Sequence, residues 1–289
     1  MPIRVERAAR IPVDKAWIGA PAGTVTNPTV WLLALSLAML AVGSAAYAAA
    51  ACPAWVVVLW QAAALYVIFT PLHESMHGIA HANATANEWI GRVSGALLTI
   101  TLPLFRAVHY EHHSHTNDPA RDPDYYVAKR PRVLLPLWCV GVVSEYRRHY
   151  YRRRLWRSPR ELRETIAQDV LLAGGMLAAV VAGHWRALFA LWVGPALVAV
   201  LVLAFWFDFV PHYPYDTDER YLDTRTYGGA VANALLLGQN QHLIHHLWTT
   251  IPWFRYRPVV ARIHDELVAR GCRIGLRVTP LPTERKAAS

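Results

Sequence analysis

The sequence predicts an all-α integral membrane protein with four transmembrane helices and a cytoplasmic helical cap that holds a histidine-rich site for two metals. The first observation is composition, since 54% of the 289 residues are hydrophobic and only 17% are charged, against roughly 25% in soluble domains. The second is that the apolar residues gather in runs close to the roughly 20 residues that cross a bilayer. The third is a set of histidines that recur at helical spacing.

The amino-terminal segment, residues 1–28, is expected to be a cytoplasmic tail. It contains four basic residues and three prolines before residue 26 and has no apolar core, so it does not resemble a cleavable signal peptide. Residues 29–289 are expected to form a single membrane domain. The net charge of +9 fits retention of basic segments on the cytoplasmic side, and no nucleic-acid-binding motif accompanies it.

The first two spans are expected at residues 29–51 and 54–72, with Cys52 and Pro53 in the turn between them. This helical hairpin returns the chain to the side of the basic tail. His73 and His77 follow at the end of the second span, where a histidine avoids the cost of the lipid core and can meet water or metal.

Residues 89–105 and 131–143 are apolar but too short for a crossing, so both are expected at the membrane surface. The third and fourth spans are expected at residues 165–182 and 187–210. Four crossings place both termini and every histidine cluster on one side, the cytoplasmic side of the inner membrane. The cap then consists of residues 73–164 and 211–289.

A dense basic run lies between the second and third spans, with aromatic residues among its arginines. Contact with anionic lipid is the favoured interpretation, and a docking face for an acidic electron carrier is compatible with it. The arginines are Arg147, Arg148, Arg152, Arg153, Arg154, Arg157 and Arg160.

Three histidine clusters predict the metal site. His109, His112 and His113 fall at i, i+3 and i+4, on one face of a helix. The same spacing returns at His242, His245 and His246, and His73 and His77 stand at i and i+4. Eight imidazoles exceed the capacity of one ion, and His212 at the mouth of the fourth span adds a ninth. We therefore expect two metals.

The donor set favours iron. The cysteines, Cys52, Cys139 and Cys272, are too scattered for a thiolate site. Zinc usually takes four ligands and has no redox chemistry, whereas a nitrogen-rich site suits iron. Other histidines are expected to be structural or at the surface: His81, His115, His149, His184 and His264.

Several polar residues near the clusters are weighed separately. Asp118, Asp122 and Asp124 lie in turn sequences and either cap turns or orient ligating imidazoles through the second ring nitrogen. Glu74 and Glu111 should face away from the ligand stripe, and Asn240 is expected to bind metal-bound water. Five aromatic residues either line a substrate channel or form an interfacial belt: Trp55, Trp60, Phe205, Trp206 and Phe207.

The histidine clusters, HxxxH, HxxHH and HxxHH in order, resemble those of the membrane fatty-acid desaturase and hydroxylase superfamily over residues 55–257. Residues 207–216, 221–225 and 238–256, and the Asp-rich run after the second cluster, are similar to the membrane β-carotene ring hydroxylases. The resemblance implies a di-iron monooxygenase that uses O₂ and electrons from ferredoxin or a similar donor. It also implies that the nine histidines are the iron ligands.

We accordingly expect an enzyme that hydroxylates a lipophilic substrate, a carotenoid, at C3 of a β-ionone ring. An acyl-lipid desaturase or hydroxylase is the alternative, and a metal transporter fits less well because transporters bind ions near the midplane. Asp208 stands where acyl desaturases tend to carry asparagine. It is expected either to accept a hydrogen bond from iron-bound water or a ligating imidazole, or to form a salt bridge with a residue such as Arg225.

Overall fold

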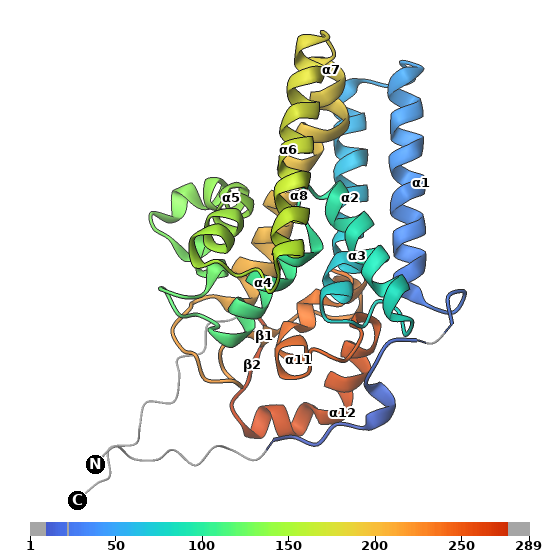
Figure 1. The fold of residues 1–289 in the computed structure, drawn as a ribbon. Helices are drawn as coiled ribbons and strands as arrows, with labels where there is room; N and C mark the ends of the chain where they lie inside the picture. Colours follow the sequence, from blue (N-terminus) through green and yellow to red (C-terminus); the bar gives the residue numbers. More distant parts are fainter. Residues whose placement is uncertain (1–9, 22, 277–289) are drawn as a thin grey trace, which may run out of the picture.

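The computed structural model describes residues 10–21 and 23–276. Four of its helical segments are long and apolar enough to cross a membrane: α1 (Pro28–Ala48), α2 (Ala54–Met76), α6 (Pro159–Val181) and the composite Trp185–His212. Figure 1 shows them standing side by side as a column, with the other elements at and beside its lower end. The predicted fold class, a four-span helical membrane protein, is confirmed.

Helix boundaries follow from local sequence signals. The side chain of Asn27 accepts from the amide of Thr29 and Pro28 opens α1. At the start of α6, the Ser158 side chain accepts from the Glu161 amide and Pro159 is the first helical residue. A proline is tolerated at this position because its missing N–H would have no partner in the helix. The structure begins α6 at Pro159 rather than 165 and extends α2 to Met76 rather than 72. His73 therefore lies in the last turn of α2.

The fourth span is not a uniform α-helix. It runs through α7 (Trp185–Leu188), a π-helical segment (Phe189–Val193), α8 (Gly194–Leu203), a second π-helical segment (Ala204–Phe209) and α9 (Val210–His212). π-helical turns are rare overall, but those that do occur are often found at functional sites. The second segment contains Asp208 and leads directly to His212.

The predicted surface segment at 89–105 forms a helical corner rather than a crossing. α3 (Ala84–Leu97) is joined to α4 (Leu102–Ser114) through a turn at Thr99 with φ +61°. A Cβ at Gly91 would lie 2.7 Å from Leu102 Cδ2 and 2.8 Å from the Ser75 side chain, so glycine lets α3 pack closely on α2 and α4. α5 (Leu135–Arg153) follows, and its buried Tyr146 joins a core with residues of α2 and α4.

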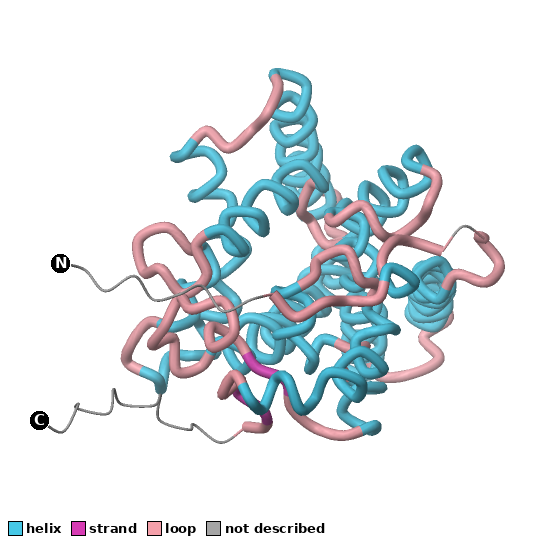
Figure 2. Tube along the Cα trace, turned by 90° about the horizontal axis from the view of Figure 1, so that it is seen from below, coloured by secondary structure: helices cyan, strands magenta, loops and turns pink. Residues whose placement is uncertain are grey.

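The carboxyl-terminal part covers the lower end of the column. It comprises β1 (Arg225–Thr226), α10 (Ala230–Leu235), α11 (His242–Leu247), α12 (Tyr256–Ala269) and β2 (Arg273–Ile274), which pairs with β1 in parallel. Figure 2, seen from below, shows helices and loops spread across that end, with the two short strands in magenta. Short 3₁₀ turns complete the described chain at Lys15–Trp17, Pro123–Ala128, Arg132–Leu134, Gln239–Gln241 and Trp253–Arg255.

The cap has a hydrophobic core of its own, formed by α11 and α12 with buried Leu243, Ile244 and Leu267. Ile11 of the amino-terminal segment joins this core, and the Gly19 amide donates to the Thr250 carbonyl oxygen. Residues 1–9 of the expected tail and 277–289 of the expected cap lie outside the described residues.

Candidate metal centre

All nine histidines of the clusters meet at the lower end of the column. They come from four separate stretches: the end of α2 for His73 and His77, α4 for the second cluster, the end of α9 for His212, and α11 for the third cluster. Two groups of four can each hold a metal ion, with one ring nitrogen per residue and all four nitrogens within 4.8 Å of one another. We call these groups site A and site B.

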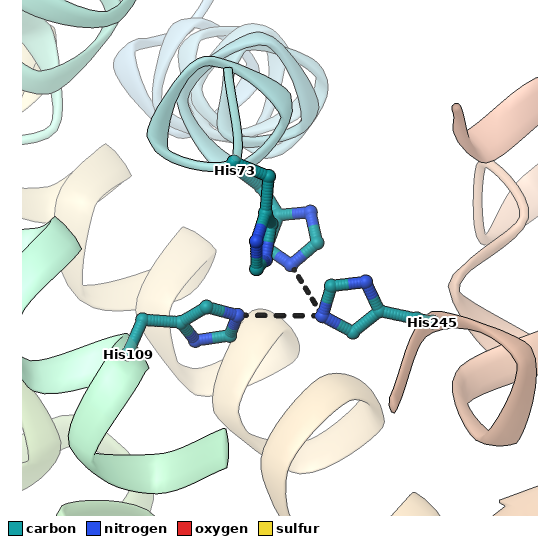
Figure 3. Close-up of side chains that lie close together, drawn as sticks. His73, His109 and His245 are labelled. Atoms are coloured by element: carbon teal, nitrogen blue, oxygen red, sulfur yellow. Dashed lines mark hydrogen bonds between the residues drawn. The ribbon is translucent and has the colours of Figure 1, made fainter. Parts of the chain in front are cut away.

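Site A consists of His73, His77, His109 and His245. His73 Nε2 lies 3.1 Å from His245 Nε2, and His109 Nε2 lies 3.4 Å from the same atom. Figure 3 shows these three rings converging from α2, α4 and the cap. A side-chain nitrogen from each of three distant segments thus faces one point.

Site B consists of His112, His212, His242 and His246. His246 Nε2 lies 3.2 Å from His112 Nε2 and 3.1 Å from His242 Nε2. The His212 ring centroid is 4.7 Å from that of His112 and 5.0 Å from that of His242. Only the tertiary structure brings the lone histidine of the fourth span into this group.

His113 lies beside both groups. Its Nε2 is 3.0 Å from His109 Nε2 and 2.9 Å from His245 Nε2 in site A. Its ring centroid is 4.3 Å from that of His246 in site B. The structure thus gathers all nine sequence-predicted ligands into one continuous cluster.

The chemistry of the donor set fits bound cations. A neutral imidazole carries one proton, so a set of converging ring nitrogens cannot all be satisfied by donating to one another. His77 Nε2 and both ring nitrogens of His212 are buried with no hydrogen-bond partner among the described residues. Buried polar atoms normally have partners, and a cation at each convergence point would supply one to His77 Nε2 and to one of the two nitrogens of His212.

Burial keeps most of these rings in the form that binds metal. It lowers the pKa of His109, His113 and His246 well below the usual range, and the neighbouring histidines add to the effect. The same holds for the pKa of His242 and His245. A neutral imidazole presents a lone pair, as a ligand must.

His112 is the exception. Burial alone would lower its pKa, but the carboxylates of Asp122 and Asp124 raise it to about 10. Its Nδ1 lies 2.9 Å from Asp122 Oδ1 and 3.4 Å from Asp124 Oδ2. This nitrogen is on the opposite side of the ring from Nε2, so the carboxylates orient the ring while Nε2 faces site B. Asp122 therefore makes both of the contacts considered for it. It lies against a ring nitrogen of His112, and it caps the turn at Asp124.

Other ring-orienting contacts were not foreseen from the sequence. His245 Nδ1 lies 3.1 Å from the Tyr256 hydroxyl, and His246 Nδ1 lies 3.5 Å from Thr116 Oγ1. The spacing of eleven residues between His245 and Tyr256 crosses a turn and two helices, so no local sequence pattern indicates this contact. Thr116, in contrast, lies only three residues after His113.

An apolar cavity of about 270 Å³ connects the histidines with the membrane-spanning segments. His73, His109 and His242 form one part of its wall, while Leu172 and Met176 of α6 lie in another. The wall also includes a small polar group: Asp124, Asp208, Gln239 and Tyr146. The Tyr146 hydroxyl donates to Asp124 Oδ1 at 2.6 Å. A mostly apolar pocket with a few polar groups at one end is the usual form of a site for a lipophilic ligand.

The two predicted polar site residues differ in their surroundings. Asp208 lines the cavity, and its carboxylate has no ion pair within the described ranges. Arg225, considered as its partner, donates instead to the carbonyl oxygens of Tyr213 and Gly275. Asn240 is buried and its side-chain amide donates to the Tyr227 carbonyl oxygen, so this contact joins the turn before the third cluster to the residue that follows β1.

The remaining predicted residues lie apart from the two groups. His81 is bonded to Thr24 and the Asn83 amide, and neither His149, His184 nor His264 belongs to a metal group among the described residues. Glu111 faces away from the ligands, toward Arg153 at 3.3 Å. Of the five aromatic residues proposed for a channel, only Phe207 lines the cavity at the histidines. Trp55 and Trp60 are exposed, as an interfacial belt requires.

Comparison with known proteins agrees with this geometry. The sequence model of the fatty acid desaturase family matches residues 50–276. The chain is similar to a zeaxanthin 4-ketolase of Chlamydomonas reinhardtii, with 27% identity over 65% of this chain and 39% of that protein. It is also similar to a beta-carotene 4-ketolase of Protosiphon botryoides, with 24% identity over 65% of this chain and 46% of the relative. The chain thus spans less than half the length of these curated relatives.

Proposed function

Because the chain belongs to the fatty acid desaturase family, we propose that it is an oxygen-dependent oxidoreductase of the membrane with two non-haem irons. The observation that carries this proposal is the apolar cavity whose wall includes His73, His109 and His242. It joins a pair of nitrogen-rich groups to the space between membrane-spanning helices. Such an arrangement suits oxidation of a molecule that is soluble only in the bilayer.

We assign one iron to site A and the other to site B, with His113 between them. Zinc is the less suitable ion, because it prefers four ligands and brings no redox chemistry. A pair of irons held there would supply activation of O₂ with two electrons and two protons, so that one oxygen atom enters a C–H bond and the other leaves as water. The chain's own residues hold the ions, orient the rings and surround the substrate with apolar side chains.

We propose a carotenoid as the substrate. The names of the two relatives, a zeaxanthin ketolase and a beta-carotene ketolase, support a carotenoid ring. The cavity agrees, since its lining is dominated by residues such as Leu172, Met176 and Val200. An acyl chain would also be apolar, and the description of the family names fatty acids, so the names of the two relatives are what favours a carotenoid.

The product distinguishes two forms of the proposal. Ketone formation at C4 is favoured by the names of the relatives and needs two successive oxygen insertions at one carbon. The second insertion gives a geminal diol, which loses water to leave the ketone. A single insertion at C3, giving an alcohol, is the second candidate, and it is favoured by the resemblance of residues 207–216 and 238–256 to the ring hydroxylases.

Two polar residues are assigned supporting roles. Asp208 is proposed to accept a hydrogen bond at the cavity wall close to site B, where a free carboxylate in a membrane protein needs a donor. Asn240 is proposed to hold water near the third cluster through its side-chain oxygen, which has no partner among the described residues.

The electron donor is proposed to be ferredoxin or a similar acidic carrier that approaches from the cytoplasm. Arg152, Arg153 and Arg154 are exposed at the end of α5, and α5 packs beside α4, which carries the second cluster. Basic residues at this end of the column also favour a cytoplasmic orientation of both metal sites.

The test is expression of the chain in a host that accumulates β-carotene, followed by pigment and lipid profiling. We expect oxygenated carotenoids that are absent when His112→Ala replaces the wild type, and the position and oxidation level of the new oxygen separate the ketone from the alcohol. Unchanged carotenoids together with altered fatty acids would replace the proposal with an acyl-lipid oxidase.

A further inference from the structure

The two metal groups differ in the side chain that contacts the Nδ1 atom of one of their imidazoles, on the side of the ring away from the other histidines. In site B, His112 Nδ1 lies 2.9 Å from the carboxylate of Asp122. In site A, His245 Nδ1 lies 3.1 Å from the hydroxyl of Tyr256. One site is therefore supported by a carboxylate and the other by a phenol.

Asp122 is fixed in this position by its own surroundings. Its Oδ2 accepts from the Asn117 amide at 2.7 Å, and its Oδ1 accepts from the Asp124 amide at 2.8 Å. Its side chain is buried, as is that of His112. The carboxylate cannot rotate away without breaking these bonds, so it holds the ring of His112 rigidly with Nε2 toward site B.

Site A has no equivalent carboxylate at hydrogen-bond distance from a ring nitrogen among the described residues. The nearest approach is that of Glu74 Oε1 to His73 Nδ1, at 3.8 Å. The other oxygen of Glu74 accepts from the Trp253 amide at 3.2 Å. Glu74 is thus bonded to the cap rather than to a ligand.

We propose that Asp122 is a positioning residue that sets the metal affinity of site B alone, and that Tyr256 does the same more weakly for site A. A carboxylate behind an imidazole fixes the tautomer with the proton on Nδ1 and makes Nε2 a stronger donor. A neutral hydroxyl orients the ring but adds no charge. The two metal positions are therefore chemically unequal. The proposal rests on the proposed function for the identity of the metal.

The test is anaerobic titration of the full-length, detergent-solubilised protein with Fe²⁺ in competition with a chromophoric chelator. We expect the wild type to bind two equivalents. Asp122→Asn should weaken one equivalent by about 10- to 100-fold, as loss of such a partner typically does, and leave the other unchanged. Tyr256→Phe should weaken the other equivalent by a smaller factor, and the double variant should weaken both.

Asp118→Asn is the matched control, because Asp118 lies in the same loop but bonds to the Ala120 amide and Arg121 rather than to a histidine. It should leave both equivalents unchanged. Asp124→Asn provides a second variant, since Asp124 Oδ2 lies 3.4 Å from the same nitrogen of His112. It should weaken the same equivalent as Asp122→Asn, but less, and it serves if Asp122→Asn does not fold.

Equal weakening of both equivalents by Asp122→Asn would overturn the inference, because a purely structural role affects the whole cluster. Unchanged affinity of both would overturn it as well. If the variants behave in either of these ways while the wild type binds two irons and oxidises a carotenoid, the proposed function stands and only this inference fails. A wild type that binds no iron would refute both.

Discussion

His113 Nε2 lies 2.9 Å from His245 Nε2 of site A, while the ring of His113 packs 4.3 Å, centroid to centroid, from that of His246 of site B. One side chain thus contacts both metal groups. Because α4 places His109, His112 and His113 on one face, a single helix supplies a histidine to each group and the residue between them.

The first prediction concerns the nine histidines. His112→Ala and His245→Ala should each abolish turnover and lower the iron content, because each removes a nitrogen from a group of four. His113→Ala should lower the iron content as well, although no group of four includes it. His149→Ala and His264→Ala are the controls and should retain iron and activity. Metal analysis of purified variants measures the result, and zinc as the native ion would contradict it.

The second prediction concerns the cavity. Ala196 lies in its wall on the fourth span, and an indole there would fill much of a volume of about 270 Å³. Ala196→Trp should reduce carotenoid oxidation at least about tenfold while the iron content stays unchanged. Val181→Trp is the matched control, because Val181 is 79% exposed at the end of α6 and lies outside the cavity. Equal turnover by the two variants would refute a substrate role for this cavity.

The third prediction concerns Asp208. Asp208→Asn keeps the shape of the side chain but replaces a carboxyl oxygen with an amide nitrogen, so the fold and most of the iron should be retained. The ratio of product formed to O₂ consumed should fall severalfold, because the hydrogen bond proposed at the cavity wall is altered. Oxygen uptake and product analysis measure this ratio. Wild-type coupling with a lower melting temperature would instead indicate a structural role for Asp208. That role would not be a salt bridge to Arg225, because Arg225 donates to the Tyr213 carbonyl oxygen.

The fourth prediction concerns the electron donor. Replacing Arg152, Arg153 and Arg154 with glutamine should raise the donor concentration needed for half-maximal turnover severalfold. The difference should shrink at high salt, since exposed charges are screened. Arg257→Gln removes an exposed arginine from α12 and is the control. If donor dependence is unchanged and only membrane retention is lost, the arginines bind lipid.

The fifth prediction concerns orientation in the membrane. Cysteines introduced at the exposed positions Ala82, Ser114 and Thr250 should all react with a membrane-impermeant reagent from the cytoplasmic side only. Native Cys52 lies in the turn between α1 and α2 at the opposite end of the column, so it should react from the other side. Labelling of Ser114→Cys and Cys52 from the same side would contradict four crossings.

The sequence by itself determined the features that depend on local periodicity. Apolar runs close to span length predicted the four crossings, with boundaries that the structure changes by only a few residues. The i, i+3 and i+4 spacing placed His109, His112 and His113 on one helix face, as the structure has them.

Only the tertiary structure decided which histidine joins which group. His112 and His113 are adjacent in sequence, yet His112 faces site B and His113 lies beside both sites. The partners Tyr256 of His245 and Tyr146 of Asp124 also come from other elements. A helical repeat fixes the direction of a side chain relative to its own axis, whereas these contacts depend on how α2, α4, α9 and α11 pack together. That packing depends on close approaches such as that of Gly91 to Leu102 and on the π-helical turn before His212. Neither feature is indicated by a local sequence pattern.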